Sequence, residues 1–269
     1  MNDLKQMLIL ARYQLRNYIR AKRLYILIII AAVVISLIVY VNATFGNPAE
    51  QEVKDTASDF AGFAPTLVVL TALFFGGDAI ASEYQNKTGY FLFPNPIRRV
   101  SIFWGKYIAS FISSILIVLM YYLSGAVYVF YYHQTVPVEY YYSLAYSLIF
   151  LLSLLSLTYM FSTFFKSGAV AFAIVTFLYF LVFNIIDGLS QIAGIEPWFS
   201  ITYAASIITL VFSGKYMGDY THSQVIHAGR GITITIYQPY LWEGVAIMLA
   251  YLVIASLIGT IVFQKKEMK

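Results

Sequence analysis

The chain has 269 residues, of which 60% are hydrophobic and only 11% are charged, and its net charge is +4. Soluble globular domains carry about a quarter charged residues, so this composition excludes a water-soluble fold and indicates that membrane lipid covers most of the surface. Cysteine is absent, which excludes disulfides and thiolate metal sites. We expect no nucleic-acid partner. Many of the 24 tyrosines fall near predicted helix ends, where their rings are expected at the level of the lipid headgroups.

The first 23 residues predict an amphipathic helix at the membrane surface. Apolar side chains recur at spacings of three and four from Leu4 to Tyr18, while Arg12, Arg16 and Arg20 lie four apart on another face. Anionic lipid attracts such arginines, so we expect residues 1–23 to lie along the inner leaflet. A cytoplasmic partner would also dock at that level.

Six segments with few charges are each long enough to cross a membrane. A helix needs about 20 mainly apolar residues to cross a hydrocarbon core of about 30 Å. The predicted fold is therefore an all-α membrane protein, with residues 1–269 forming a single transmembrane domain. The spans are expected near residues 24–41, 60–80, 103–132, 140–165, 167–187 and 240–264.

The distribution of Lys and Arg predicts how these spans are oriented. Fourteen of the 17 basic residues fall in the N-terminal segment, the second and fourth connections and the C-terminal tail. The opposite side holds Lys54, Lys215 and Arg230, together with most of the acidic residues. Since basic residues accumulate in cytoplasmic segments, we expect a multi-pass protein of the plasma membrane with both termini in the cytoplasm.

Residues 188–239 form the one long external connection. Polar residues recur at helical spacing from Thr202 to Ser213, which predicts a short helix that lies on the outer leaflet or dips into it. Isoleucine and threonine alternate from Gly231 to Tyr237, which is typical of a strand.

The second connection, residues 82–101, carries the most specific pattern in the chain. A glutamate at the inner end of the second span is followed by a threonine, a leucine, a proline, an arginine and a Gly-Lys pair in the third span. This pattern resembles the signature of the type 2 exporter permeases of the ATP-binding-cassette superfamily, which also have an amphipathic N-terminal helix and six spans. Lys87, where the family usually has glycine, and the additional Pro94 depart from the signature. The matching residues are Glu83, Thr88, Leu92, Pro96, Arg98, Gly105 and Lys106.

The resemblance implies that two permeases pair, either two copies of this chain or this chain and a similar permease. Each would bind a cytoplasmic ATP-binding-cassette ATPase subunit through a coupling helix in residues 82–101, and the first and fifth spans would form the dimer seam and line the substrate route. The residues implied in coupling are Glu83, Tyr84, Thr88, Leu92, Phe93, Pro96, Arg98 and Lys106.

Physical reasoning adds detail to this implied site. Tyr84, Leu92 and Phe93 could anchor in a groove of the partner, as rigid apolar side chains often do at interfaces. Glu83 could pair with Arg98, Arg99 or a basic residue of the N-terminal helix. For Arg98 and Lys106, the general preference for positive charge on the inner side explains their presence equally well.

The chain is not expected to be an enzyme or to bind a cofactor. No phosphate loop of the form GxxxxGK[ST] occurs, so ATP and Mg are expected in a separate ATPase subunit. His222 and His227 are five apart without a completing carboxylate or cysteine, which favours a solvated loop over a metal site. Asp78 and Asp187 lie near the ends of spans, where we expect each to reach headgroup water.

Two other functions stay open at this point. One is a channel or secondary transporter that needs no ATPase, which should place charges near the middle of the membrane. The other is a membrane-anchored binding or assembly protein that uses residues 188–239.

Overall fold

The computed structural model describes residues 3–46, 48–85, 98–213, 223–228 and 232–266. Six helical segments within this part of the chain are long and apolar enough to span a membrane, which confirms the predicted all-α membrane protein. They run Arg23–Gly46, Val53–Gln85, Arg99–His133, Val138–Phe164, Gly168–Ala193 and Leu241–Lys265.

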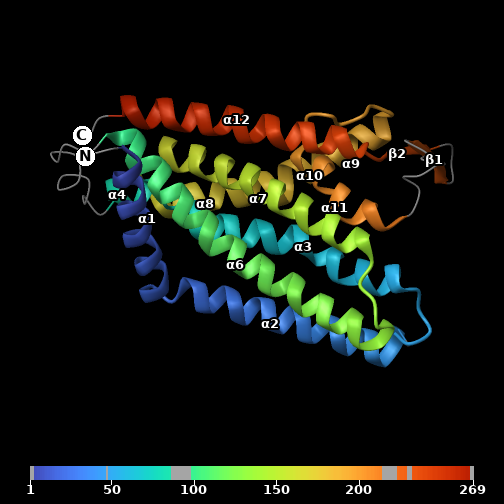
Figure 1. Cartoon of the computed structure of the whole chain (residues 1–269). Helices are drawn as coiled ribbons and strands as arrows, with labels where there is room; N and C mark the ends of the chain where they lie inside the picture. The colour runs from blue at the N-terminus through green and yellow to red at the C-terminus, as the bar shows by residue number, and fades with distance from the viewer. Residues whose placement is uncertain (1–2, 47, 86–97, 214–222, 229–231, 267–269) are drawn as a thin grey trace.

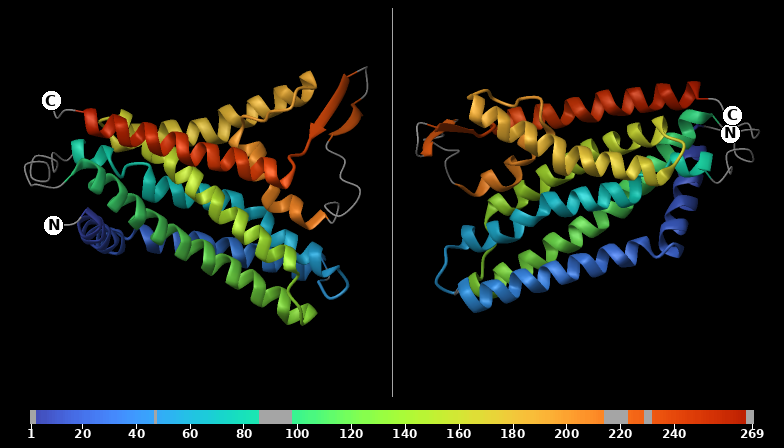
Figure 2. Two further views of the ribbon diagram at one scale, coloured as in Figure 1. Left: turned by 45° about the horizontal axis from the view of Figure 1, so that its top comes forward. Right: turned by 180° about the vertical axis from the view of Figure 1, so that it is seen from behind.

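The spans lie side by side, and both chain termini lie at the same end of the bundle (Figure 1). We call this the termini end, and the opposite end, which carries a β-hairpin, the hairpin end. Helix α1 (Asp3–Arg20) runs across the termini end, roughly perpendicular to α2 (Arg23–Val41) (Figure 2). Lys22 makes the corner between them in the left-handed conformation, with φ of 58°. Arg12, Arg16 and Arg20 are exposed on α1, whereas Ala11 and Tyr18 are buried against the bundle.

Helix α3 (Val53–Gly76) is the centre of the bundle. It packs against α6 (Arg99–His133) and α7 (Val138–Phe164), and α12 (Leu241–Lys265) packs along the other side of α7. Because a 35-residue α-helix is about 52 Å long, α6 must tilt or extend beyond a hydrocarbon core of about 30 Å.

The fifth span is not a regular α-helix. It consists of α8 (Gly168–Phe177), a π-helical segment η2 (Leu178–Phe183) and α9 (Asn184–Ala193). The Asn184 side-chain amide donates to the carbonyls of Tyr179 at 3.0 Å and Phe180 at 3.2 Å, both in the π-helical segment. The first span likewise ends in a π-helical turn, η1 (Asn42–Gly46).

The segment expected on the outer leaflet lies inside the bundle instead. It forms α10 (Ile201–Ala205), α11 (Ile207–Leu210) and a short 3-10 turn, η3 (Val211–Ser213), which pack against α3, α7 and α12. Ile201, Ala204 and Ile207 are completely buried. Gly244 of α12 permits this, because a Cβ there would lie 2.6 Å from the Ile207 side chain.

A two-stranded antiparallel hairpin follows at this end. Strand β2 (Ile232–Tyr237) falls where the alternating pattern predicts a strand, and pairs with β1 (Ser223–Ala228), which no pattern indicated. His227 therefore lies in a strand and not in a loop, while His222 lies outside the described residues. The Tyr237 hydroxyl donates to the Gly194 carbonyl at 2.7 Å, which fastens the hairpin to the end of α9.

Several tyrosines are buried between helices, where their hydroxyls bond to neighbouring helices. Tyr122 of α6 hydrogen-bonds to Ser143 at 2.9 Å and Ser147 at 2.7 Å on α7. Tyr140 donates to the Tyr122 carbonyl at 2.9 Å. In an apolar bundle such pairs satisfy hydroxyls that lipid could not and join neighbouring helices.

The close approach of α3, α6 and α7 can be tested at Gly125. A Cβ at this position would lie 3.0 Å from the Phe60 ring and would also meet the Tyr140 hydroxyl, so Gly125→Ala should destabilise the protein by about 1–3 kcal/mol through overpacking. The measurement is the melting temperature of the detergent-solubilised protein. Gly62→Ala on α3 is the matched control, since no atom lies within 4 Å of a Cβ there. Equal melting temperatures for the two variants would contradict this packing.

Candidate functional site

The third helix breaks at the termini end, and the break leads directly into the second connection. Helix α3 ends at Gly76, a turn follows, and α4 (Ala81–Gln85) is the last element before residue 86. We call residues 74–85 the elbow. Gly76 and Gly77 allow it to pack closely, because a Cβ would lie 3.3 Å from Leu155 of α7 at the first and 3.2 Å from Phe172 of α8 at the second.

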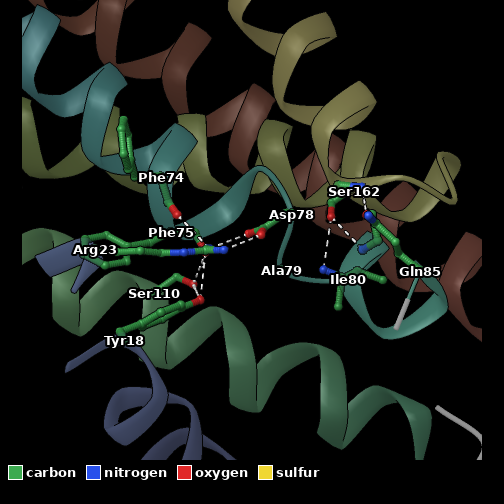
Figure 3. Close-up of polar contacts among 12 residues, drawn as sticks. Tyr18, Arg23, Phe74, Phe75, Asp78, Ala79, Ile80, Gln85, Ser110 and Ser162 are labelled. Carbon is green, nitrogen blue, oxygen red and sulfur yellow. Dashed lines mark hydrogen bonds and ion pairs between the residues drawn. The ribbon is translucent and has the colours of Figure 1, made fainter. Parts of the chain in front are cut away.

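The elbow frees backbone carbonyls that side chains of other helices then satisfy (Figure 3). The Phe75 carbonyl accepts from the hydroxyls of Tyr18 at 2.8 Å and Ser110 at 2.9 Å. The Phe74 carbonyl accepts from the Arg23 guanidinium at 3.3 Å. Burial raises the pKa of Tyr18, so its hydroxyl stays protonated as a donor. Helices α1, α2 and α6 are thus all attached to the end of α3.

The backbone amides of the elbow are satisfied in the same way. The Ser162 hydroxyl of α7 accepts from the amides of both Ile80 and Ala81 at 3.0 Å (Figure 3). The Lys106 ammonium of α6 donates to the Ala79 carbonyl at 2.8 Å. These bonds permit a non-helical turn here, because buried backbone groups need hydrogen-bonding partners from the protein.

Lys106 also forms an ion pair with Glu83. Both side chains are well buried, with 6% of Lys106 and 13% of Glu83 exposed. Taking such charges out of water is favourable only when they are paired and hydrogen-bonded, as here. The two residues stand at opposite ends of the second connection, so the pair closes that connection at its base. The sequence suggested Arg98, Arg99 or α1 for Glu83 and overlooked Lys106, which the fold brings to it.

A second ion pair joins the elbow to α2. Arg23 donates to both carboxylate oxygens of Asp78, at 2.7 and 2.6 Å, and both side chains are partly exposed (Figure 3). Asp78 is therefore a partner of the first span and not merely a residue reaching for headgroup water. Gly168, the first residue of α8, packs against it, since a Cβ there would lie 2.6 Å from the Asp78 Cβ. The Gln85 side chain accepts from the Gly168 amide at 3.0 Å.

The arginines near the C-terminal end of the second connection bind two different ends of the chain. Arg98 pairs with Asp3 of α1 at 2.8 Å on an exposed surface. Arg99 donates to the carbonyls of Gln264 at 2.9 Å and Lys266 at 2.6 Å, and so caps the C-terminal end of α12.

Lys266 caps the end of another helix. Its ammonium donates to the carbonyls of Thr163 at 2.6 Å and Phe165 at 3.0 Å, at the end of α7. It also lies 4.3 Å from the centre of the Tyr84 ring, within the range of a cation–π contact. Burial, with Lys166 as a secondary influence, lowers the pKa of Lys266.

The described part of the site thus brings together Glu83, Tyr84 and Lys106 from the predicted set, with Arg98 at its edge. Thr88, Leu92, Phe93 and Pro96 lie outside the described residues. Sequence reasoning missed three interhelical hydrogen-bonding residues, the donors Tyr18 and Ser110 and the acceptor Ser162. Serine and tyrosine are frequent throughout the spans, so no sequence signal distinguishes these three.

At the level of sequence, residues 8–268 match the profile of the family described as ABC-2 family transporter protein. No curated protein matches the chain.

The Glu83–Lys106 pair can be tested by a double-mutant cycle. Lys106→Met removes the ammonium beside the buried Glu83 carboxylate, and Glu83→Gln removes the carboxylate beside the buried Lys106 ammonium, so each should destabilise the protein by about 3–5 kcal/mol. The double variant should lose less than the sum of the two, because neither charge is then left unpaired. The melting temperature in detergent reports both effects.

Asp3→Asn serves as the control for this cycle. It breaks the Arg98–Asp3 pair, in which 42% of the Asp3 side chain is exposed, so its effect should stay below about 1 kcal/mol. Additive losses in the cycle, or an equally large loss for Asp3→Asn, would show that the buried pair is not coupled.

Proposed function

The chain belongs to the ABC-2 transporter family, and on that premise we propose that it works as one half of an ATP-driven exporter. The family consists of multi-pass membrane subunits of ATP-binding-cassette transporters, which are not themselves catalytic. The proposed assembly is a pair of permeases, two copies of this chain or this chain and a similar one, with two cytoplasmic ATPase subunits. ATP and Mg belong to those subunits, and this chain binds no cofactor. The termini end faces the cytoplasm.

The observation that carries the proposal is the buried Glu83–Lys106 pair at the base of the second connection. An ATPase that pushes on residues 86–97 must move the two ends of that connection. Because a buried ion pair is costly to break, the two ends move together and the push reaches α3 and α6 at once. A loosely held loop would absorb the same displacement.

The hydrogen bonds of the elbow support the same conclusion. Tyr18 of α1, Arg23 of α2 and Ser162 of α7 each bind its backbone. A movement of the elbow therefore affects three helices beyond α3 and α6. Among them is α2, the first span, which the family resemblance assigns to the dimer seam and the substrate route.

The surface that meets the ATPase is proposed to lie in the connection itself. Its apolar side chains, Leu92 and Phe93 above all, are proposed as the anchor, with Thr88 and Pro96 as further coupling residues. Tyr84 is the exception among the residues suggested as anchors, because its ring lies against Lys266 within the bundle and so belongs to the transmitting part.

Co-expression with an ABC ATPase tests the two roles separately. Leu92→Asp combined with Phe93→Asp should abolish co-purification of the ATPase, because charges replace the apolar anchor. Glu83→Gln combined with Lys106→Met should retain the ATPase but reduce the permease-dependent change in its hydrolysis rate about tenfold, because the base of the connection is no longer locked.

The control for the coupling experiment is Arg98→Gln with Asp3→Asn, which removes an exposed ion pair near the same connection. This variant should keep both binding and coupling. A chain that purifies alone and conducts ions without nucleotide would overturn the proposal, and so would full coupling in the Glu83/Lys106 double variant.

The absence of cysteine allows a direct test of orientation. Thr135→Cys places a single thiol at the hairpin end and Lys166→Cys one at the termini end, and both positions are exposed. A membrane-impermeant maleimide should label the first in intact cells and the second only after permeabilisation. The reverse pattern would invert the proposed topology.

A further inference from the structure

A cleft of about 390 Å³ opens beside the elbow, between the start of α2, the end of α3 and the first turn of α8. One part of its wall is polar and another part is apolar, and both lie at the termini end of the spans. Arg23 begins α2 directly after the corner that follows α1, so the polar part is at the level where lipid headgroups meet the hydrocarbon. The polar part contains Arg23, Asp78 and Gln85, and the apolar part Leu73, Phe74 and Phe172.

The Arg23 guanidinium is only partly used by the protein. It has five N–H donors. Its two terminal nitrogens donate to Asp78, and one of them also donates to the Phe74 carbonyl. The donors left over are the Nε–H and the second N–H of Nη2, which share one edge of the planar group. Within the described residues no acceptor meets this edge, and 36% of the side chain is exposed.

Two parallel donors on one edge match the oxygens of a phosphate or carboxylate. The neighbouring charges are of both signs, because the Asp78 carboxylate also lines the cleft. Both oxygens of Asp78 are already bound by Arg23, and the exposed Arg20 and Lys22 add positive charge at the same corner of the chain. An anionic group can thus reach the free edge of Arg23 without breaking the ion pair.

We propose that this cleft binds an anionic amphiphile from the leaflet at the termini end. Its phosphate or carboxylate lies on the free edge of Arg23, and its hydrocarbon chain lies along Leu73, Phe74 and Phe172. The inference goes beyond the proposed coupling role, because it names a ligand class for a cleft that the elbow helps to form. It needs no ATPase, so it stands or falls separately from the proposed function.

The experiment uses the full chain alone in phosphatidylcholine nanodiscs. Spin-labelled phosphatidic acid is added, and the fraction of motionally restricted label is compared with that for spin-labelled phosphatidylcholine. Wild type should prefer phosphatidic acid. Arg23→Gln should weaken that preference about tenfold, as expected for losing charge-assisted hydrogen bonds. Arg23→Lys, which keeps the charge but lacks the two-donor edge, should weaken it as well.

Arg98→Gln is the matched control, because Arg98 also pairs with an aspartate at the termini end but does not line the cleft. It should keep the preference. Ala169→Trp fills the cleft from an exposed position of α8 without changing any charge, and should reduce the restricted fraction of phosphatidic acid. Gel filtration and the melting temperature verify that each variant is folded.

Three outcomes would overturn the proposal. The first is no preference for phosphatidic acid in wild type, and the second is an equal loss in Arg23→Gln and Arg98→Gln, which would indicate general surface charge. The third is that inorganic phosphate displaces the spin-labelled lipid with an affinity equal to that of the lipid, while Ala169→Trp has no effect. That result would assign Arg23 to a soluble anion and not to an amphiphile.

Discussion

The structure at the termini end follows from one constraint, which is that a backbone group buried away from water needs a hydrogen-bonding partner. Once α3 stops at Gly76, the carbonyls and amides of the following turn need partners from the protein. Tyr18, Arg23, Ser110, Lys106 and Ser162 provide them from four different helices. Each of these helices is positioned by what it donates or accepts at this turn. Tyr18 and Arg23 reach this turn from the two sides of the corner between α1 and α2. Lys22 forms that corner in the left-handed backbone conformation.

How much of this the sequence predicts depends on how local the signal is. Six long apolar runs are local, so the number of spans and the all-α class could be predicted. The partner of Glu83 is not local, because Lys106 reaches it only after the elbow turns the chain. Arg98 and Arg99 are nearer in sequence, yet the ion pair that the structure gives Arg98 is with Asp3. The motif indicated that Glu83 and Lys106 matter, but not that they pair with each other.

At the hairpin end, prediction from the sequence fails for a different reason. The pattern from Thr202 to Ser213 correctly indicates helix, but a weakly polar stripe is compatible with a membrane surface and with the interior of a bundle. Gly244, more than thirty residues later, decides between them by leaving room for Ile207. Tyr122 is a similar case, because an aromatic ring with a hydroxyl suits a headgroup or a serine on a neighbouring helix, and Ser143 and Ser147 happen to face it.

The π-helical segment in the fifth span has a consequence for every residue beyond it. A π-turn contains one residue more than the α-turn it replaces, and each residue of an α-helix advances the direction of the side chain by about 100°. Relative to an uninterrupted helix, α9 is therefore rotated by about that angle with respect to α8. Asp187 lies beyond the π-helical segment and accepts a hydrogen bond from Thr202 of α10. The fifth span therefore behaves as two helices, α8 and α9. Residues at helical spacing that share a face within one of them do not continue along the same face of the other.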